Sequence, residues 1–104
     1  MIQPVDLKGS FEEVSELLDQ AFAPSDFESR LIRAVASRGE RHQAWGIREG
    51  GTLVAFVLYT EATRGAEVIG WHLAPVAVLP DHQGMGAGSE LIRRSLEMEP
   101  LVSE

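Results

Sequence analysis

Residues 73–96 read LAPVAVLPDHQGMGAGSELIRRSL, and this stretch carries the strongest structural signal in the chain. An apolar strand is followed by a short loop with three glycines in five residues and then by an amphipathic helix. Gly84, Gly86 and Gly88 lack a Cβ, so a bulky anion can approach the main chain there. The first N–H groups of the helix, which Ser89 opens, have no partner within the helix and lie at the positive end of its dipole. The stretch therefore predicts a site for an oxyanion such as a phosphate.

Three other interpretations of these glycines were compared with the sequence. In the plainest of them, the glycines only form a tight turn between strand and helix. A nucleoside-triphosphate loop needs a lysine after its last glycine, and no lysine lies between Gly84 and Glu104, which excludes that class. A dinucleotide fingerprint needs a third glycine where Ser89 stands, and an acidic residue about 20 positions further on. The dinucleotide fingerprint is therefore disfavoured.

The remaining pattern is Gln83, two free positions, Gly86, one free position and Gly88, after an apolar strand. It resembles the pyrophosphate-binding signature of the GNAT superfamily of acyl-coenzyme A dependent N-acyltransferases, Arg/Gln-x-x-Gly-x-Gly/Ala. The resemblance implies that acetyl-CoA is the co-substrate. It also implies cofactor-binding positions on the strand and in the loop: Val76, Ala77, Val78, Gln83, Gly84, Met85, Gly86, Ala87, Gly88 and Ser89.

Length and composition limit the classes of protein to consider. The 104 residues, 44% of them hydrophobic, suffice for a single domain over 1–104 with a modest core. There is no apolar run long enough to span a membrane and no secretory signal, so we expect a cytoplasmic protein without a membrane partner. The formal charge of −7 argues against nucleic acid as a partner. The chain has no cysteine, which excludes disulfides and thiolate catalysis.

Two helices are expected in the first forty residues. Ser10 and Glu13 have the spacing of a capping box, and apolar residues then recur at helical spacing as far as residue 22. Ser25 and Glu28 repeat this pattern before a second helix that ends near residue 38. A short strand, residues 2–7, precedes both helices.

Three further strands and a helix are expected in the second half. Residues 44–48 and 52–60 form an antiparallel hairpin around Gly50 and Gly51, and residues 61–67 form a polar loop. A long strand follows over 68–79, with a bulge or a free edge at Pro75 because proline cannot donate to a ladder. The last helix spans residues 86–98 and turns inward Leu91, Ile92 and Leu96, and Pro100 ends it.

The expected order is strand, helix, helix, strand, strand, strand, helix, an α/β (α+β) arrangement with a mixed, mainly antiparallel sheet. This order is similar to the first part of the GNAT fold, which continues in the family with a fifth strand, a fourth helix and two more strands. The resemblance therefore implies a partial domain, truncated before the fifth strand, whose fourth strand has an unpaired edge. We expect a homodimer formed through that edge.

The family reaction is direct attack of an amine on the thioester carbonyl, with no covalent intermediate and no metal. His72 is the candidate general base because it precedes Val78 by six positions on the same strand, although an ordinary surface or core role is the alternative. Tyr59, the only tyrosine, is expected to be a sheet residue rather than the acid that protonates the thiolate. We expect Trp45 and Trp71 in the core.

The remaining histidines, His42 and His82, are expected at the surface, and Arg93 and Arg94 on a solvated helix face.

Two functions of different classes follow. In the first, the chain is an N-acetyltransferase that moves an acetyl group from acetyl-CoA to an unidentified amine. In the second, it is a catalytically inactive GNAT-like module that binds coenzyme A or only dimerises.

Overall fold

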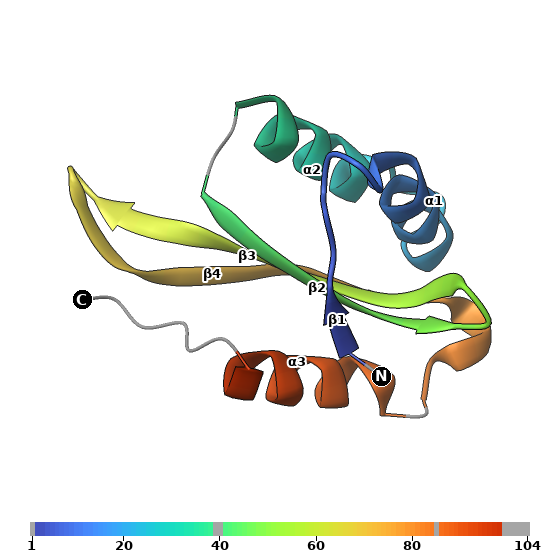
Figure 1. Ribbon diagram of the computed structural model, residues 1–104. Helices are drawn as coiled ribbons and strands as arrows, with labels where there is room; N and C mark the ends of the chain where they lie inside the picture. Colours follow the sequence, from blue (N-terminus) through green and yellow to red (C-terminus); the bar gives the residue numbers. More distant parts are fainter. Residues whose placement is uncertain (1, 39–40, 85, 99–104) are drawn as a thin grey trace.

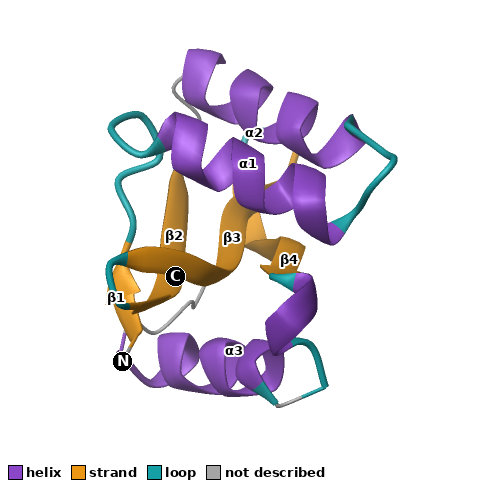
Figure 2. Ribbon diagram, turned by 90° about the vertical axis from the view of Figure 1, so that its right-hand side faces the viewer, coloured by secondary structure: helices purple, strands orange, loops and turns teal. Residues whose placement is uncertain are grey.

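Four antiparallel strands form one sheet in the order β1-β2-β3-β4. The computed structural model describes residues 2–38, 41–84 and 86–98. Helices α1 and α2 cover one face of the sheet and α3 covers the other (Figures 1 and 2). The elements are, in chain order, β1 (Ile2–Pro4), α1 (Phe11–Ala21), α2 (Phe27–Arg38), β2 (His42–Glu49), β3 (Thr52–Arg64), β4 (Glu67–Val78), a single 3-10 turn η1 (Pro80–His82) and α3 (Ala87–Met98).

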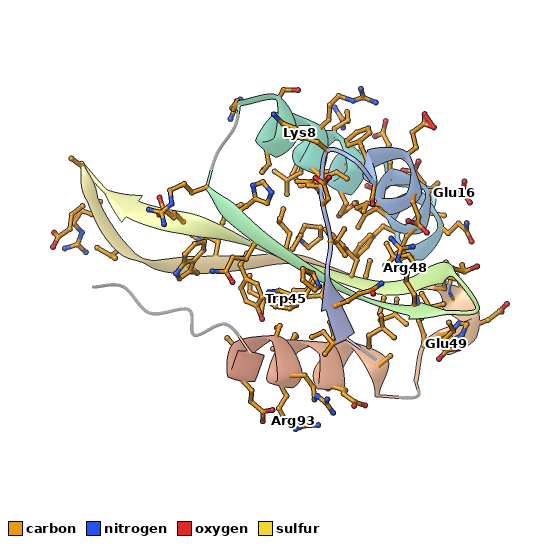
Figure 3. The ribbon with its side chains drawn as sticks, viewed as in Figure 1. Lys8, Glu16, Trp45, Arg48, Glu49 and Arg93 are labelled. Carbon is orange, nitrogen blue, oxygen red and sulfur yellow. The ribbon has the colours of Figure 1, made fainter. Side chains whose placement is uncertain are left out.

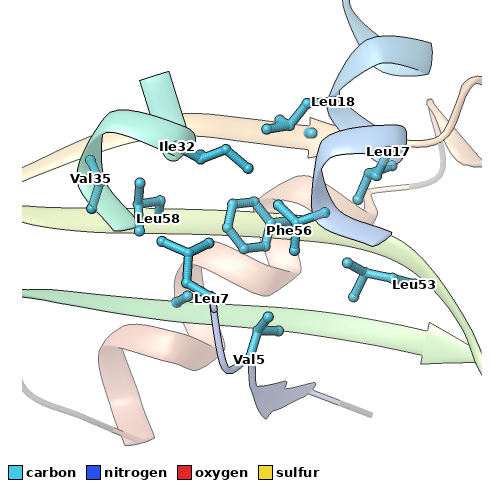
Figure 4. Packing of buried hydrophobic residues seen from close by; sticks show 12 residues of the cluster. Val5, Leu7, Leu17, Leu18, Ile32, Val35, Leu53, Phe56 and Leu58 are labelled. Carbon is cyan, nitrogen blue, oxygen red and sulfur yellow. The ribbon is translucent and has the colours of Figure 1, made fainter. Parts of the chain in front are cut away.

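Strand β3 separates two apolar cores because successive side chains point to opposite faces of a sheet. Phe56 and Leu58 are fully buried on the side of α1 and α2 (Figure 4), and Val57 and Tyr59 are buried on the side of α3. Burial of one large apolar side chain contributes about 1.5–3 kcal/mol. The sheet is thus packed on both faces, and the end of β4 packs on the α3 side through Val76 and Val78.

Helix α1 begins where the sequence predicts, but the expected capping box at Ser10 is wrong. Ser10 makes no side-chain hydrogen bond to the helix. Glu13 instead accepts hydrogen bonds from the Arg48 guanidinium and from the backbone N–H of Leu53. The hydrogen bond from Arg48 lowers the pKa of Glu13 below its usual value, and the same contact raises the pKa of Arg48. Glu13 therefore ties α1 to the β2–β3 hairpin.

Helix α2 has the predicted start. The Ser25 hydroxyl accepts a hydrogen bond from the Phe27 backbone N–H at 3.2 Å and donates one to Glu28 Oε1 at 3.2 Å. This arrangement satisfies one of the free N–H groups at the helix start.

Strands β2 and β3 are longer than the apolar pattern predicts, β4 has the predicted length but is shifted by one residue, and one strand is an exception to this trend. Strand β3 runs on to Arg64 and β4 begins at Glu67, so the polar loop expected over 61–67 is wrong. The two strands meet in a tight turn at Gly65, whose φ of +62° favours glycine. The exception is β1, which ends at Pro4 rather than at residue 7. Polar residues thus extend the sheet because cross-strand pairing, not burial, holds the outer hairpin.

Helix α3 packs with Leu91 fully buried and Ile92 half-buried, as expected. The expectation for Leu96 is wrong, because 46% of its surface is exposed. The first residue of α3 is Ala87, one position later than predicted, and the helix stop expected at Pro100 lies outside the described residues.

Candidate functional site

The glycine loop lies between the end of β4 and the start of α3. Gly84 and Gly86 have φ angles of +83° and +80°, so both use the left-handed conformation that glycine tolerates. The first hydrogen bond of α3 runs from the Glu90 N–H to the Gly86 carbonyl at 2.9 Å. The N–H groups of residues 87–89 precede this bond, so α3 itself offers them no i−4 partner among the described residues, and they lie at the positive end of the helix dipole. Met85, expected in the loop, lies outside the described residues.

Gln83, the first residue of the signature, fixes the loop to the sheet. Its side-chain Nε2 donates a hydrogen bond of 2.9 Å to the backbone carbonyl of Val78, the last residue of β4. The spacing between Gln83 and the glycines therefore has a direct structural reason. With its side chain anchored on β4, the chain is positioned to turn through Gly84 and Gly86 into α3.

The outer edge of β4 carries backbone groups that do not bond to β3. The Leu79 N–H donates to the Val54 carbonyl at 2.9 Å, so Leu79 and, two residues earlier, Ala77 face β3. Val76 and Val78 alternate with them and turn their N–H groups to the edge. These two donors lie about 7 Å apart, since an antiparallel strand rises about 3.4 Å per residue.

A bulge in β4 precedes this edge, as the proline predicts. The register with β3 shifts between Val57, which pairs with Val76, and Tyr59, which pairs with Leu73. Pro75 lies within the bulge and is buried. The bulge bends the strand just before the exposed donors.

Gly88 brings helix α3 close to the same edge. A Cβ at this position would lie 3.5 Å from Cγ2 of Val78 and 3.7 Å from Cγ1 of Val76, which is ordinary van der Waals contact. The first turn of α3 therefore packs against the same two residues of β4 whose N–H groups point to the edge. Ser89 is exposed on this first turn of the helix.

His82 contributes a contact that the sequence did not reveal. Its Nε2 lies 3.1 Å from Oε1 of Glu49 at the end of β2, and its side chain is only 28% exposed. The expectation of a plain surface histidine is therefore wrong. This contact joins the β2–β3 hairpin to the turn that precedes the loop.

The other side chains singled out from the sequence occupy varied places. His72 pairs with Thr60 and is exposed, on the α1 and α2 side of the sheet that Leu58 also faces. Trp45 is buried and Trp71 half-buried against the α3 side.

Tyr59 is buried, and its hydroxyl lies 2.9 Å from the Ser95 Oγ.

His42 is half-buried rather than at the surface.

The solvated helix face is confirmed for Arg93 and Arg94, which form i,i+4 ion pairs with Glu97 and Glu90.

A cavity of about 510 Å³ lies on the far side of α3 from the β4 edge. Its walls come from β1, β2, β3, the turn η1 and α3, and no residue of β4 takes part. The cavity and the strand edge are therefore different features, although His82 and Ala87 border both the cavity and the loop.

The glycine loop that follows a bulged fourth strand at the edge of the sheet is the arrangement that the sequence resemblance to the GNAT superfamily predicted. A family model described as "Acetyltransferase (GNAT) family" matches residues 11–98, and the chain belongs to this family.

A curated relative, the uncharacterized N-acetyltransferase YjhQ of Escherichia coli K12, is 33% identical over 95 residues. The match covers 86% of this chain and 52% of the relative, so the chain spans about half of that protein's length.

Two solved structures have the same fold. A GNAT family acetyltransferase from Brucella melitensis in complex with acetyl-CoA is 26% identical with a TM-score of 0.82, over 94% of this chain and 66% of that one. YhbS from Escherichia coli in complex with CoA is 20% identical with a TM-score of 0.83, over 94% of this chain and 54% of that one. Among the described residues, no helix is both long enough and apolar enough to cross a membrane.

Proposed function

We propose that the chain binds acetyl-CoA along the glycine loop and the outer edge of β4, and transfers the acetyl group to an amine. The observation that carries this proposal is the shared corner of β4 and α3. There the first N–H groups of α3, at residues 87–89, lie next to the outward donors of Val76 and Val78. A diphosphate matches the helix start, and the amides of a pantetheine arm match an open strand edge.

The proposed reaction needs positioning more than covalent chemistry. The amine nitrogen attacks the thioester carbonyl carbon, the C–S bond breaks, and the sulfur leaves with its electron pair and takes up a proton. The backbone N–H of Val78 stabilises the negative charge that develops on the carbonyl oxygen. His72 lies six positions before Val78, roughly 20 Å away along an extended strand, so the proton that the amine loses passes to solvent water rather than directly to this histidine.

An inactive, CoA-binding or merely dimerising module is the alternative, and Tyr59 favours it. Its hydroxyl is buried and bonded to Ser95, so this tyrosine is not available to protonate a leaving thiolate. In this alternative the loop and the strand edge still hold coenzyme A, but no acetyl group is transferred.

Two measurements separate these functions. Isothermal titration calorimetry with acetyl-CoA tests binding, and we expect saturable binding with one site per chain. Release of free thiol in the presence of a panel of amines tests transfer. Binding without thiol release supports the inactive module. If neither acetyl-CoA binding nor thiol release is observed, acetyl-CoA is not the ligand and the proposal fails.

We also propose that β4 associates with a second copy through its outer edge. Ile69 and Leu73 on this strand are 51% and 40% exposed, and β4 is the edge of the described sheet. An exposed apolar edge is a template for strand pairing. Light scattering at micromolar concentration is expected to give the mass of a dimer, and Leu73→Lys to give a monomer. A monomer for the unmodified chain would refute this proposal.

The proposed location is the cytoplasm, which the cysteine-free sequence suits.

A further inference from the structure

His82 lies in the turn that leads from β4 into the glycine loop. Within turn η1 its backbone N–H donates to the Leu79 carbonyl at 2.8 Å, and the Gln83 N–H donates to the Pro80 carbonyl at 3.3 Å. Only Gln83 separates His82 from Gly84, the first left-handed residue of the loop. A movement of this turn therefore moves the loop and the start of α3.

Two adjacent side chains bond this turn to two different strands. Gln83 Nε2 donates to the Val78 carbonyl of β4 at 2.9 Å. His82 Nε2 lies 3.1 Å from Oε1 of Glu49, the last residue of β2. Because an ionised carboxylate only accepts hydrogen bonds, the proton is assigned to Nε2 of His82, which donates in both the neutral and the protonated ring. One bond alone would let the turn pivot, whereas bonds to two strands fix its orientation.

Both partners of the contact between His82 and Glu49 are held in place. The Nδ1 atom of His82 is buried, so the ring is packed on the edge opposite to Glu49. Next to Glu49, the Arg48 guanidinium bonds to Glu13 of α1, and the Leu53 N–H donates to the same carboxylate at 3.3 Å. Figure 3 shows Arg48 and Glu49 at the end of the sheet that lies over the start of α3. The carboxylate that holds the turn therefore has a fixed support.

We propose that His82 is a positioning residue for acetyl-CoA. Its hydrogen bond to Glu49 holds turn η1 against the β2–β3 hairpin, so that the loop presents the first N–H groups of α3 to the diphosphate. A loop that already has the binding conformation loses less conformational freedom when the ligand arrives, which raises the affinity. This role rests on the proposed function and adds to it a residue that precedes the glycine signature.

Two variants of Glu49 isolate the hydrogen bond. Glu49→Ala and Glu49→Gln remove the same negative charge, so they change the attraction of the anionic acetyl-CoA equally, but only glutamine keeps an oxygen that accepts from His82. We expect Glu49→Ala to bind acetyl-CoA about threefold more weakly than Glu49→Gln in calorimetry, as suits a partly exposed hydrogen bond. Equal affinities of the two variants would overturn the positioning role.

Variants of His82 test the same bond from the donor side. His82→Leu removes the donor and His82→Gln supplies another one, so we expect glutamine to restore the affinity that leucine loses. The double variant Glu49→Ala/His82→Leu is expected to lose no more affinity than the weaker of the two single variants, because both changes break one bond. Losses that add in the double variant would show that each residue acts by itself and would overturn the proposal.

A measurement without ligand tests whether the bond holds the turn. Exchange of the Gln83 N–H, followed by NMR, is expected to be about threefold faster in Glu49→Ala than in Glu49→Gln. The Leu79 N–H, which bonds to Val54 of β3, is the internal control and is expected to exchange at the same rate in both variants. An unchanged rate at Gln83 would overturn the proposal.

The outcomes distinguish this role from a purely structural one and from the proposed function. A lower melting temperature in Glu49→Ala together with an unchanged affinity would make the contact structural only and would overturn the positioning role. Failure of the unmodified chain to bind acetyl-CoA would refute the proposed function, and with it the role of His82. Normal binding by the unmodified chain without a difference between the variants would refute the role of His82 alone.

Discussion

Replacement of Gly86 by alanine tests whether the left-handed loop conformation serves ligand binding. Gly86 has a φ of +80°, and no atom lies within 4 Å of the position that a Cβ would take. The cost of the substitution is therefore backbone strain alone, about 1–2 kcal/mol. In a domain of this size each 1 kcal/mol lowers the melting temperature by roughly 4–8 °C.

Gly65 provides the matched control for this strain. It has a φ of +62°, also with nothing within 4 Å of a Cβ, but it lies in the turn between β3 and β4. Gly65→Ala is expected to cost about the same stability, measured by thermal unfolding. Gly88→Ala is expected to raise the stability by about 0.5 kcal/mol, because alanine favours a helix and its Cβ fits against Val78 and Val76.

The affinity for acetyl-CoA separates the two strained variants. In Gly86→Ala, relief of the strain turns backbone N–H groups away from the diphosphate. Loss of one hydrogen bond to a charged group costs about 1.5–3 kcal/mol, which is roughly tenfold or more in the dissociation constant measured by calorimetry. Gly65→Ala is expected to bind normally. Equal losses of affinity in both variants, or an unchanged affinity in Gly86→Ala, would refute the role of the loop.

Three further predictions concern single side chains. Arg48 depresses the pKa of Glu13, so this pair stabilises the fold above the unfolded pKa of about 4.3 and loses that contribution as the pH falls through the lower folded pKa. Glu13→Gln is therefore expected to flatten the pH profile of the unfolding free energy between about pH 5 and 3, measured by chemical denaturation. An unchanged profile would contradict the pairing. Tyr59→Phe removes a buried hydrogen bond to Ser95 and is expected to lower the free energy of unfolding by about 1 kcal/mol, measured by thermal unfolding, without changing the affinity for acetyl-CoA. A large loss of affinity would instead assign Tyr59 to the binding site. Gln83→Ala removes the hydrogen bond to the last carbonyl of β4 and is expected to weaken acetyl-CoA binding about fivefold in calorimetry. Gln83→Arg, which the family signature also allows, is expected to bind acetyl-CoA with the affinity of the unmodified chain. Equal losses of affinity in both variants would exclude the anchoring role.

The sequence predicted the order of all the major elements and the family. It did so because these features depend on local signals, namely the helical spacing of apolar residues, the paired glycines and the loop from Gln83 to Gly88. The bulge at Pro75 was likewise foreseeable, since the missing donor is a property of the residue itself.

The errors have a common physical cause, which is that distant partners override local pattern. Glu13 has the spacing of a cap but bonds across to Arg48 and Leu53 on the sheet. Residues 61–64 look like a loop but pair with the first residues of β4. His82 meets Glu49 from 33 positions away, and the cavity beside them forms only when β1 and α3 come together. None of these contacts leaves a signal in a single sequence.

The sheet order has a consequence for how the chain acquires its structure. Strands β2, β3 and β4 follow one another in the sequence and in space, joined by turns at Gly50, Gly51 and Gly65. Closing such short loops loses little chain entropy, so this three-stranded meander can form before the helices dock on either side. We expect folding on a millisecond time scale, with the meander as the nucleus and β1, which closes over the much longer α1–α2 segment, as the last strand to join.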